Sequence, residues 1–246
     1  MRLQGMTAVV TGGASGFGAG IARRFAAEGA QVMVADLNAD GAAALAAEIG
    51  GVAQAVDVAD GASVEAMAGA ARAAWGETDI LVNNAGTTHT PMALEEVSEA
   101  EFDRVLAVNA KSVYLTARAF VPAMKARRAG AILNIASTAG LSPRPNLNWY
   151  NASKGWMVTA TKAMAVELAP AGVRVNALCP VAGETPLLAR FMGEDTPEVR
   201  AKFLSTIPIG RFSTPEDLAA AATFLCSAEA SMITGAALEV DGGRCI

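Results

Sequence analysis

The sequence has few histidine and cysteine side chains, which are common ligands of transition metals. Its single histidine, His89, lies in a threonine-rich segment, and we expect it to be solvated rather than catalytic. The three cysteines are widely separated and form neither a CxxC pair nor a zinc-binding spacing. They are interpreted as reduced thiols in a reducing compartment, and no metal site is predicted. The cysteines are Cys179, Cys226 and Cys245.

The sequence also lacks a basic stripe and a long apolar run. Lysine and arginine total 19 against 24 aspartate and glutamate residues, which gives a net charge of −5. A chain of this charge is a poor partner for a phosphate backbone, so nucleic-acid binding is not expected. No apolar stretch is long enough to span a bilayer, and residues 1–5 lead into a short apolar strand rather than a signal-peptide core. We therefore expect a cytoplasmic protein with no membrane partner.

What the sequence does contain is a regular alternation of β-branched runs and alanine-rich helical stretches. Hydrophobic residues make up 52% of the 246 residues and charged residues 17%, which suits a large buried sheet. Strands that are apolar on both faces and separated by helices predict a three-layer αβα, doubly wound Rossmann fold with a parallel sheet. The predicted strands are residues 7–10, 31–35, 51–56, 80–82, 131–136, 173–178 and 237–240, and the predicted helices are residues 18–28, 40–49, 62–75, 99–124, 150–168 and 215–227.

One domain is expected for the whole chain, residues 1–246, because no repeat or low-complexity linker divides it. The one long irregular stretch is predicted at about residues 180–211, where four prolines interrupt any continuous helix. Segments of this kind at the ends of parallel strands often cover a ligand. We therefore interpret it as a substrate lid.

A glycine cluster, Thr11–Gly18, follows the first predicted strand and opens the first helix. The three glycines Gly12, Gly16 and Gly18 permit a tight turn and place a helix N-terminus where it can bind a pyrophosphate. The spacing is GxxxGxG rather than the more common GxGxxG of dinucleotide sites. Taken alone, the cluster could equally be a simple strand-to-helix turn.

Acidic and amide residues follow the next three strands. Asp36, at the end of the second strand, can accept hydrogen bonds from the adenosine ribose and would repel a 2′-phosphate. No basic residue stands at Ser15 or Leu37 to offset that repulsion, so NAD is predicted over NADP. Asp57 after the third strand could contact the adenine, and residues 83–86 after the fourth could lie beside a nucleotide. Each of these could equally serve turn chemistry.

Tyr150 and Lys154 lie four residues apart near the start of a predicted helix and so share one face. A nearby ammonium lowers the pKa of a phenol, which otherwise stays near 10 and makes a poor base at neutral pH. Such a pair alone is a weak signal. Ser137 strengthens it, because it follows the fifth strand at the sheet edge where ligands collect. Asn109, inside a helical stretch, would by itself be read as an exposed helix residue.

Together these segments resemble the short-chain dehydrogenase/reductase family, in its compact single-domain branch. The resemblance rests on the order of Thr11–Gly18, residues 83–86, Asn109, Ser137, residues 150–154 and residues 240–243, and runs from about residue 4 to 243. It implies a seven-stranded sheet in the order 3-2-1-4-5-6-7 and a homotetramer.

The resemblance also implies a role for each matching residue. Tyr150 would be the general acid and base, Ser137 would bind the substrate oxygen, Lys154 would lower the Tyr150 pKa and bind the ribose, and Asn109 would hold a relay water. The residues expected to contact NAD are Gly12, Ser15, Gly16, Phe17, Gly18, Asp36, Leu37, Asp57, Val58, Asn84, Ala85, Gly86, Tyr150, Lys154, Pro180, Gly183 and Thr185.

Two positions depart from the family pattern. Phe17 replaces an aliphatic residue between two glycines and should alter packing more than chemistry. Val181 stands where the family usually has glycine after Pro180, which puts the local backbone in doubt because β-branched residues resist positive φ. Thr185 still falls where a hydroxyl would meet the nicotinamide amide.

The residues expected near the substrate are mostly apolar, which suits a hydrophobic or cyclic alcohol or ketone. Arg144 and Arg190 could receive a carboxylate, although exposed arginines usually contact only water. We predict an NAD(H)-dependent oxidoreductase that interconverts a secondary alcohol and a ketone. The alternatives are a 3-oxoacyl-carrier-protein reductase-like enzyme, a nucleotide-sensing protein without chemistry, and a lyase or epimerase. The apolar positions are Leu141, Leu147, Trp149, Leu187, Leu188, Phe191 and Met192.

Overall fold

The computed structural model describes residues 1–246 and contains one parallel sheet. Seven strands lie in the order β3-β2-β1-β4-β5-β6-β7, with every neighbouring pair parallel. The fold class and the strand order implied by the family resemblance are confirmed. The strands are β1 (Thr7–Thr11), β2 (Gln31–Asp36), β3 (Val52–Ala55), β4 (Ile80–Asn83), β5 (Gly130–Ile135), β6 (Val173–Pro180) and β7 (Ala237–Val240).

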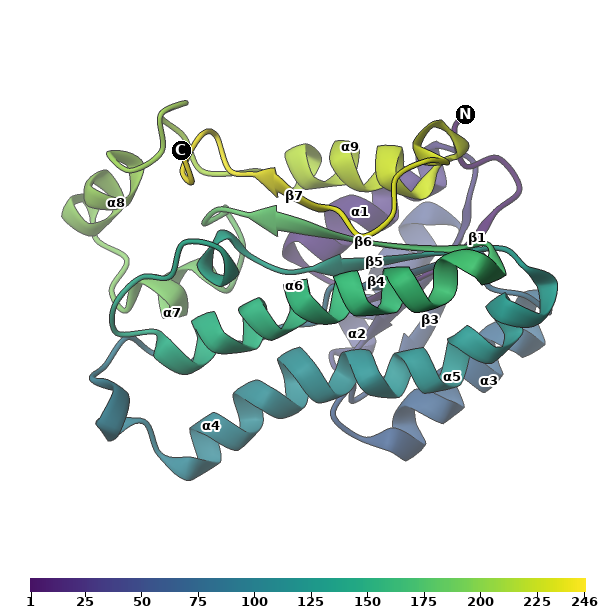
Figure 1. Cartoon of the computed structure of the whole chain (residues 1–246), viewed down its shortest axis with the longest axis horizontal. Helices are drawn as coiled ribbons and strands as arrows, with labels where there is room; N and C mark the ends of the chain where they lie inside the picture. The colour runs from purple at the N-terminus through teal and green to yellow at the C-terminus, as the bar shows by residue number, and fades with distance from the viewer.

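Helices cover both faces of the sheet (Figure 1). On one face lie α1 (Gly16–Ala27), α2 (Ala39–Ile49) and α9 (Pro215–Cys226), and on the other α3 (Gly61–Trp75), α5 (Ser112–Arg127) and α6 (Asn148–Leu168). No helix of the chain combines the length and the apolar character needed to cross a membrane.

The core forms because successive strand residues point to opposite faces. In β1, Ala8 and Val10 join a cluster of 25 buried residues with α1, α2 and α9. Val9 between them joins a cluster of 17 residues with α3, α5 and α6. Both faces of the central strands are therefore dry, as their continuous apolar sequences predicted.

The helix predicted over residues 99–124 is not one regular helix. It consists of α4 (Glu99–Leu106), a π-helical turn (Ala107–Lys111) and α5. Apolar periodicity does not distinguish a π turn from an α turn, so the pattern gave no sign of the break. The turn places the side chain of Asn109 toward the loop that follows β4.

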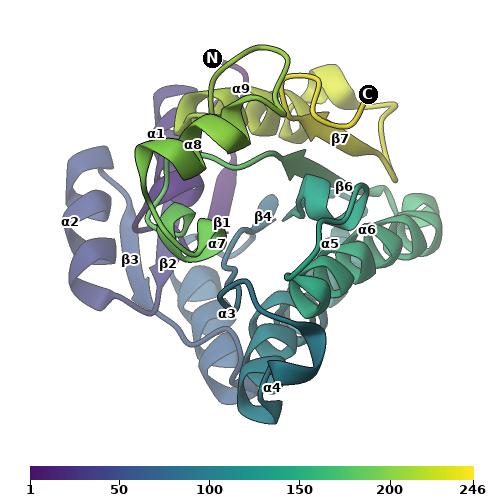
Figure 2. The ribbon, with the colours of Figure 1, turned by 90° about the vertical axis from the view of Figure 1, so that its left-hand side faces the viewer.

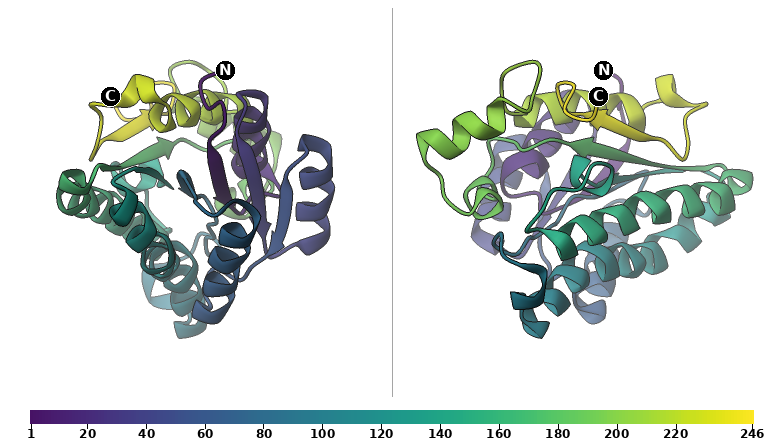
Figure 3. Two further views of the ribbon diagram at one scale, coloured as in Figure 1. Left: turned by 90° about the vertical axis from the view of Figure 1, so that its right-hand side faces the viewer. Right: turned by 60° about the vertical axis from the view of Figure 1, so that its left-hand side comes forward.

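The lid region is also more regular than predicted. Two short helices, α7 (Leu188–Met192) and α8 (Pro197–Leu204), lie beyond the carboxyl ends of the strands, at the front of Figure 2. In the right-hand view of Figure 3 these helices extend past the ends of the strands. They rest on a small apolar cluster of their own, formed by Val181, Leu188, Met192, Ile207 and Phe212.

Candidate active site

A cavity of about 690 Å³ opens at the carboxyl ends of the strands, beneath the lid. All but two of the site residues predicted from the sequence line it, and the exceptions are Gly18 and Asn109. The structure therefore brings together segments that are far apart in the chain. The predicted residues that line it are Gly12, Ser15, Gly16, Phe17, Asp36, Leu37, Asp57, Val58, Asn84, Ala85, Gly86, Ser137, Tyr150, Lys154, Pro180, Gly183 and Thr185.

The glycine turn between β1 and α1 forms one end of this cavity. Gly12 and Gly16 have φ of 60° and 51°, a region that favours glycine. A Cβ at Gly18 would lie 2.1 Å from the carbonyl oxygen of Gly12, so this glycine permits close packing of the helix on the turn. Ser15, the N-cap of α1, makes no side-chain hydrogen bond to the helix. The first-turn N–H groups therefore remain available for an anion, and the turn fits a pyrophosphate.

Asp36 lies beside the glycine turn at the end of β2. Its carboxylate accepts hydrogen bonds of 2.9 Å from the N–H of Ala14 and 2.9 Å from the N–H of Asn38. It thus holds the turn in place while it faces the cavity. Leu37 is 76% exposed. Asp57 accepts a bond of 2.9 Å from the N–H of Ala59, so the turn chemistry proposed as its alternative role is present.

The segment after β4 is tied to the same turn. The Asn84 side-chain amide donates bonds of 2.9 Å to the carbonyl oxygens of both Thr11 and Gly12. A Cβ at Gly86 would meet Lys154 Nζ at 3.5 Å and Asn109 Oδ1 at 3.6 Å. Gly86 therefore marks a close approach among the loop, α6 and the π turn.

Tyr150 and Lys154 lie in the first turns of α6 and are almost fully buried, at 6% and 4% exposed. Lys154 Nζ lies 6.0 Å from the centre of the Tyr150 ring and donates a bond of 2.8 Å to the carbonyl oxygen of Ile135 on β5. This bond fixes the ammonium at the sheet edge. Burial lowers the Lys154 pKa to about 8, so the side chain retains its charge at neutral pH.

The acidity of Tyr150 differs from the expectation. Burial dominates and raises its pKa above 10, because a phenolate is disfavoured away from water. Two groups act in the opposite direction. They are the hydroxyl of Ser137, which can donate to the phenolate, and the positive charge of Arg144. The predicted lowering by Lys154 is not the leading effect in this environment.

Ser137 follows β5 and lies at the start of a short 3-10 turn, Thr138–Gly140. Its hydroxyl accepts a bond of 3.1 Å from the N–H of Ala139, which leaves the hydroxyl hydrogen free to face the cavity. The residue is 6% exposed. The serine is thus held by its own turn beside Tyr150.

Asn109 lies behind the cavity rather than in its wall. Its Oδ1 accepts a bond of 2.8 Å from the N–H of Thr87, and its Nδ2 donates bonds of 2.9 Å to the Thr87 carbonyl and the Ser153 hydroxyl. The side chain is fully buried. It joins the loop after β4 to the π turn and to α6, a role that its reading as an exposed helix residue would have missed.

The structure accommodates the two departures from the family pattern separately. Val181 does not have positive φ, so the feared backbone strain is absent and the side chain packs in the lid cluster. The close approach occurs at Gly183 instead. A Cβ there would lie 2.2 Å from the ring carbon Cζ of Phe17, so the larger ring at 17 requires the missing side chain at 183.

Two expectations about basic side chains are corrected. His89 is fully buried rather than solvated; its Nδ1 bonds the Thr90 carbonyl at 2.8 Å, and its Nε2 has no partner. Arg144 is half-buried rather than exposed, with its guanidinium 4.2 Å and 4.4 Å from the ring centres of Phe191 and Phe203. The surrounding elements bury both residues, and a polar local sequence gives no sign of such packing.

Only some of the apolar residues expected near the substrate line the cavity. Leu187, Leu188 and Phe191 line it, whereas Leu141, Leu147, Trp149 and Met192 do not. Arg190 pairs with Glu101 of α4 at 3.1 Å. Among the further lining residues that sequence reasoning missed are two polar ones, Thr87 and Arg104. Arg104 donates to both Thr87 and Glu101, and only the folded chain brings these groups together.

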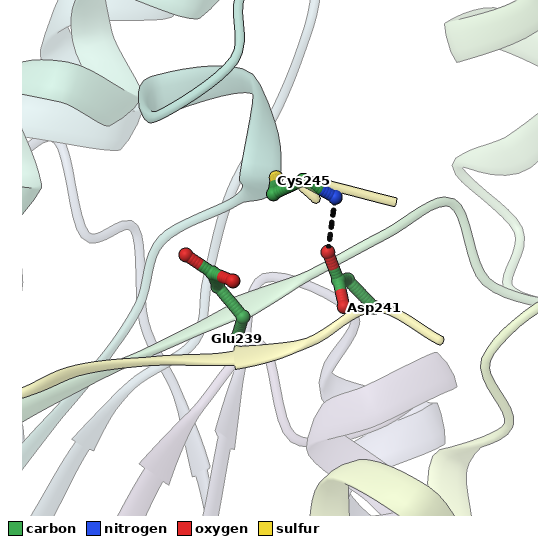
Figure 4. A group of neighbouring side chains, drawn as sticks. All are labelled: Glu239, Asp241 and Cys245. Carbon is green, nitrogen blue, oxygen red and sulfur yellow. Dashed lines mark hydrogen bonds between the residues drawn. The ribbon is translucent and has the colours of Figure 1, made fainter. Parts of the chain in front are cut away.

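Glu239, Asp241 and Cys245 cluster near the C-terminus (Figure 4). The two Asp241 oxygens accept bonds of 2.9 Å and 2.8 Å from the N–H groups of Gly243 and Cys245. Burial and the adjacent Asp241 raise the Cys245 pKa to about 11. The carboxylate is thus occupied by a turn and the thiol is protonated, so the cluster serves the fold. All three cysteines are free, as predicted.

Comparison with known proteins agrees with this geometry. A family model described as "Enoyl-(Acyl carrier protein) reductase" matches residues 12–244. The chain is 52% identical to 4-formylbenzenesulfonate dehydrogenase of Comamonas testosteroni, covering 99% of each protein. It is 43% identical to D-threitol dehydrogenase of Mycolicibacterium smegmatis, covering 100% of this chain and 95% of that one.

A solved structure is equally similar. It is a 3-ketoacyl-(acyl-carrier-protein) reductase from Brucella melitensis in complex with NADH. The TM-score is 0.95 and the identity 52%, with 99% of this chain and 100% of that chain covered. The similarity extends over the whole fold, including the lid.

Proposed function

The chain belongs to the short-chain dehydrogenase/reductase family, and within it we propose an NAD(H)-dependent enzyme that interconverts a secondary alcohol and a ketone. It is an oxidoreductase of that family, whose dehydrogenases use nicotinamide cofactors. The observation that carries the finer proposal is the convergence of Ser137, Tyr150 and Lys154 on the cavity that the glycine turn also lines.

The residues of the cavity fit a dinucleotide. The uncapped start of α1 suits the pyrophosphate, and Asp36 faces the position of a ribose. A carboxylate there repels a 2′-phosphate, and exposed Leu37 supplies no cation to offset this repulsion. The proposal of NAD rather than NADP rests on these two residues. It is consistent with the NADH bound to the Brucella melitensis reductase.

The proton chemistry follows from the position of Tyr150. In the oxidation direction its phenolate takes the hydroxyl proton of the alcohol, and in reduction its hydroxyl returns a proton to the carbonyl oxygen. Bound nicotinamide supplies hydride acceptance or donation at the carbinol carbon. Ser137 donates to the substrate oxygen and sets its distance from Tyr150. Lys154, anchored on Ile135, supplies positive charge beside the phenol and a donor for the ribose.

Asn109 serves this site by position. Because its side-chain amide is engaged with Thr87 and Ser153, a relay water cannot rely on that side chain. A backbone carbonyl of the π turn would then have to accept the hydrogen bond of such a water. In this proposal the side chain of Asn109 fixes the conformation of the π turn. The turn in turn positions the water through which a proton reaches Lys154.

A second substrate class is favoured by one comparison. The relative with 52% identity is named for 4-formylbenzenesulfonate, which carries an aldehyde. A hydrated aldehyde presents the same H–C–O–H unit as a secondary alcohol, so one Ser–Tyr site can oxidise either, with the aldehyde hydrate yielding an acid. The 3-oxoacyl reductase alternative is supported by the Brucella melitensis structure, and a 3-oxoacyl thioester tests it.

The experiment measures NADH absorbance with secondary alcohols, ketones, an aromatic aldehyde sulfonate and a 3-oxoacyl thioester. Tyr150→Phe should lose turnover by roughly a hundredfold or more, because the proton-transfer group is gone, while NADH binding by calorimetry stays close to wild type. Turnover that survives in Tyr150→Phe would remove the catalytic assignment. NADH binding without turnover of any substrate would support the nucleotide-sensing alternative.

We also propose that four copies assemble. Apolar side chains remain exposed on the outer faces of α5 and α6, and exposed apolar patches mark contact surfaces. Light scattering should give the mass of a tetramer, and Trp156→Glu with Val166→Glu should lower it. A monomeric wild-type protein would contradict the proposal. The residues are Tyr114, Trp156 and Val166, at 52%, 43% and 80% exposed.

A further inference from the structure

Arg144 occupies an unusual place between the catalytic helix and the lid. It lies six residues before Tyr150, in the loop that leads into α6. Its guanidinium lies over two lid rings, Phe191 of α7 and Phe203 of α8, and donates a hydrogen bond to the Phe191 carbonyl. Guanidinium groups stack well on aromatic faces. One side chain thus joins both lid helices to the loop before Tyr150.

Phe191 extends this contact to the catalytic phenol. The rings of Tyr150 and Phe191 meet edge to face, with centres 5.6 Å apart. Phe191 also lines the cavity, whereas Arg144 does not. Arg144 therefore acts on the reaction through Phe191 and Tyr150 rather than by touching substrate.

The charge of Arg144 has no carboxylate partner. The lid arginines, by contrast, form ion pairs: Arg190 with Glu101, Arg200 with Asp195 and Glu184, and Arg211 with Asp217. The charged and titratable groups that act on Arg144 are Tyr150 and Arg244. A half-buried cation without a counter-ion is disfavoured. The phenolate of Tyr150 is the one anion in its surroundings that would relieve this.

Lys154 also places a positive charge near Tyr150, and the remaining groups around the phenol are paired or neutral. Lys154 Nζ is held by the Ile135 carbonyl, and Arg104, which also lines the cavity, is paired with Glu101. Cys179, which interacts with Lys154, has a pKa raised to about 11 by burial and remains a neutral thiol. Arg144 is the cation that opposes the burial of the phenolate.

We propose that Arg144 is a positioning residue of the active site, which clamps the lid phenylalanines against Tyr150 and favours the phenolate by its charge. This inference rests on the proposed function for its catalytic meaning. The proposal assigns two separate effects to the Arg144 guanidinium. The planar stack holds the lid, and the positive charge favours the ionised phenol.

The first test measures the ionisation of the Tyr150 phenol directly and does not depend on turnover. The chain has two tyrosines, Tyr114 and Tyr150, so a Tyr114→Phe background leaves one phenol to titrate by near-ultraviolet absorbance. Arg144→Gln in this background should raise the titration midpoint by about half a pH unit or more, since a cation is lost from a poorly solvated site. Arg144→Lys should keep most of the wild-type midpoint. Arg190→Gln loosens the lid at Glu101 and is the matched control, with no shift expected.

The second test measures how Arg144 affects KM and the pH profile of turnover. Arg144→Gln and Arg144→Lys should both raise KM severalfold, because each loses the stack, but only Arg144→Gln should move the acidic limb of the oxidation pH profile upward. Phe203→Leu should raise KM and leave the profile in place. If Arg144→Gln does not fold, Arg144→Met replaces it, since a thioether can lie between the rings.

The results distinguish a failure of the Arg144 proposal from a failure of the proposed catalytic function. An unchanged midpoint and pH profile in the neutral variants, with KM raised equally in all of them, would make Arg144 a lid contact only and overturn the proposal. A shifted midpoint in a protein that turns over none of the substrates would instead overturn the proposed function, while the effect of Arg144 on Tyr150 would stand.

Discussion

The ring of Phe17 occupies the space that a side chain at residue 183 would need. A Cβ at Gly183 would lie 2.2 Å from Phe17 Cζ and 3.0 Å from the carbonyl oxygen of Ser213. The first helix and the segment after β6 thus meet at the cavity mouth, where the Phe17 ring packs against the backbone of Gly183. The fit is specific to this pair, which makes it testable by paired substitution.

Gly183→Ala should destabilise the protein by about 1–3 kcal/mol through overpacking, as measured by urea unfolding. Phe17→Leu in the same chain should recover part of that loss, because the shorter side chain vacates the contact. Gly69→Ala is the matched control, since a Cβ there meets nothing within 4 Å, and it should be neutral or slightly stabilising. Additive losses in the double variant would show that the two residues are not coupled.

Lys154→Met should stabilise the protein at neutral pH. Burial lowers the Lys154 pKa from 10.5 to about 8, so between these values the unfolded chain binds more protons than the folded protein. The penalty of roughly 3 kcal/mol is complete below the folded pKa and vanishes above the unfolded one. After loss of the bond to Ile135, a net gain of about 2 kcal/mol remains.

The measurement is the free energy of unfolding of both proteins as a function of pH. The gain should shrink as pH rises from 8 to 10.5. Cys226 and Cys245 titrate alike in both proteins and cancel in the difference. Cys179 interacts with Lys154, but burial raises its pKa to about 11, so it stays largely protonated in the folded state over this range. Lys162→Met on the exposed side of α6 is the control, with a difference that stays near zero. A gain that does not change with pH would mean that the ammonium is not desolvated.

A change at the end of β2 should alter cofactor preference. Asp36→Asn with Leu37→Arg removes the repulsion of a 2′-phosphate and adds a guanidinium to bind it. Asparagine is chosen because its carbonyl can still accept the N–H of Ala14, which alanine cannot. The ratio of kcat/KM for NADPH over NADH should rise about tenfold or more, the value of one charge-assisted bond. Leu37→Arg alone should give a smaller rise, and no change in the ratio would place the ribose elsewhere.

The sequence predicted the sheet well because its signals are local. All seven strands lie within two residues of their predicted bounds, since runs such as that of β1 are apolar on both faces and end at glycine or polar residues. The cavity walls were equally predictable, because parallel strands place the residues that follow them at one edge. Gly12 and Ser137 each follow a strand in this way, and Asp36 ends one.

The errors arose where burial depends on distant parts of the chain. His89 and Arg144 are polar residues in polar segments, and only the packing of the lid and the loop after β4 encloses them. The π turn around Asn109 escaped because its period is close to that of an α-helix. The helix α8 could have been found, since Thr196 and Pro197 give the usual start signal of an N-cap followed by proline.

Asn109→Ala should destabilise the protein and loosen the loop after β4. The substitution removes the partners of the Thr87 N–H and carbonyl, and leaving these partly buried polar groups unpaired costs up to about 1–3 kcal/mol each. Hydrogen exchange should show faster exchange of the Thr87 amide, and KM should rise because Thr87 lines the cavity. Asn109→Asp should keep the Thr87 amide protected, since its carboxylate can accept from the Thr87 N–H, but it should still destabilise the protein because it cannot donate to the Thr87 carbonyl or to Ser153. Asn148→Ala, at the exposed start of α6, is the control and should change neither value. If the Thr87 amide stayed protected in Asn109→Ala, the π turn would hold its shape without this side chain, and the asparagine would have to act on a water directly.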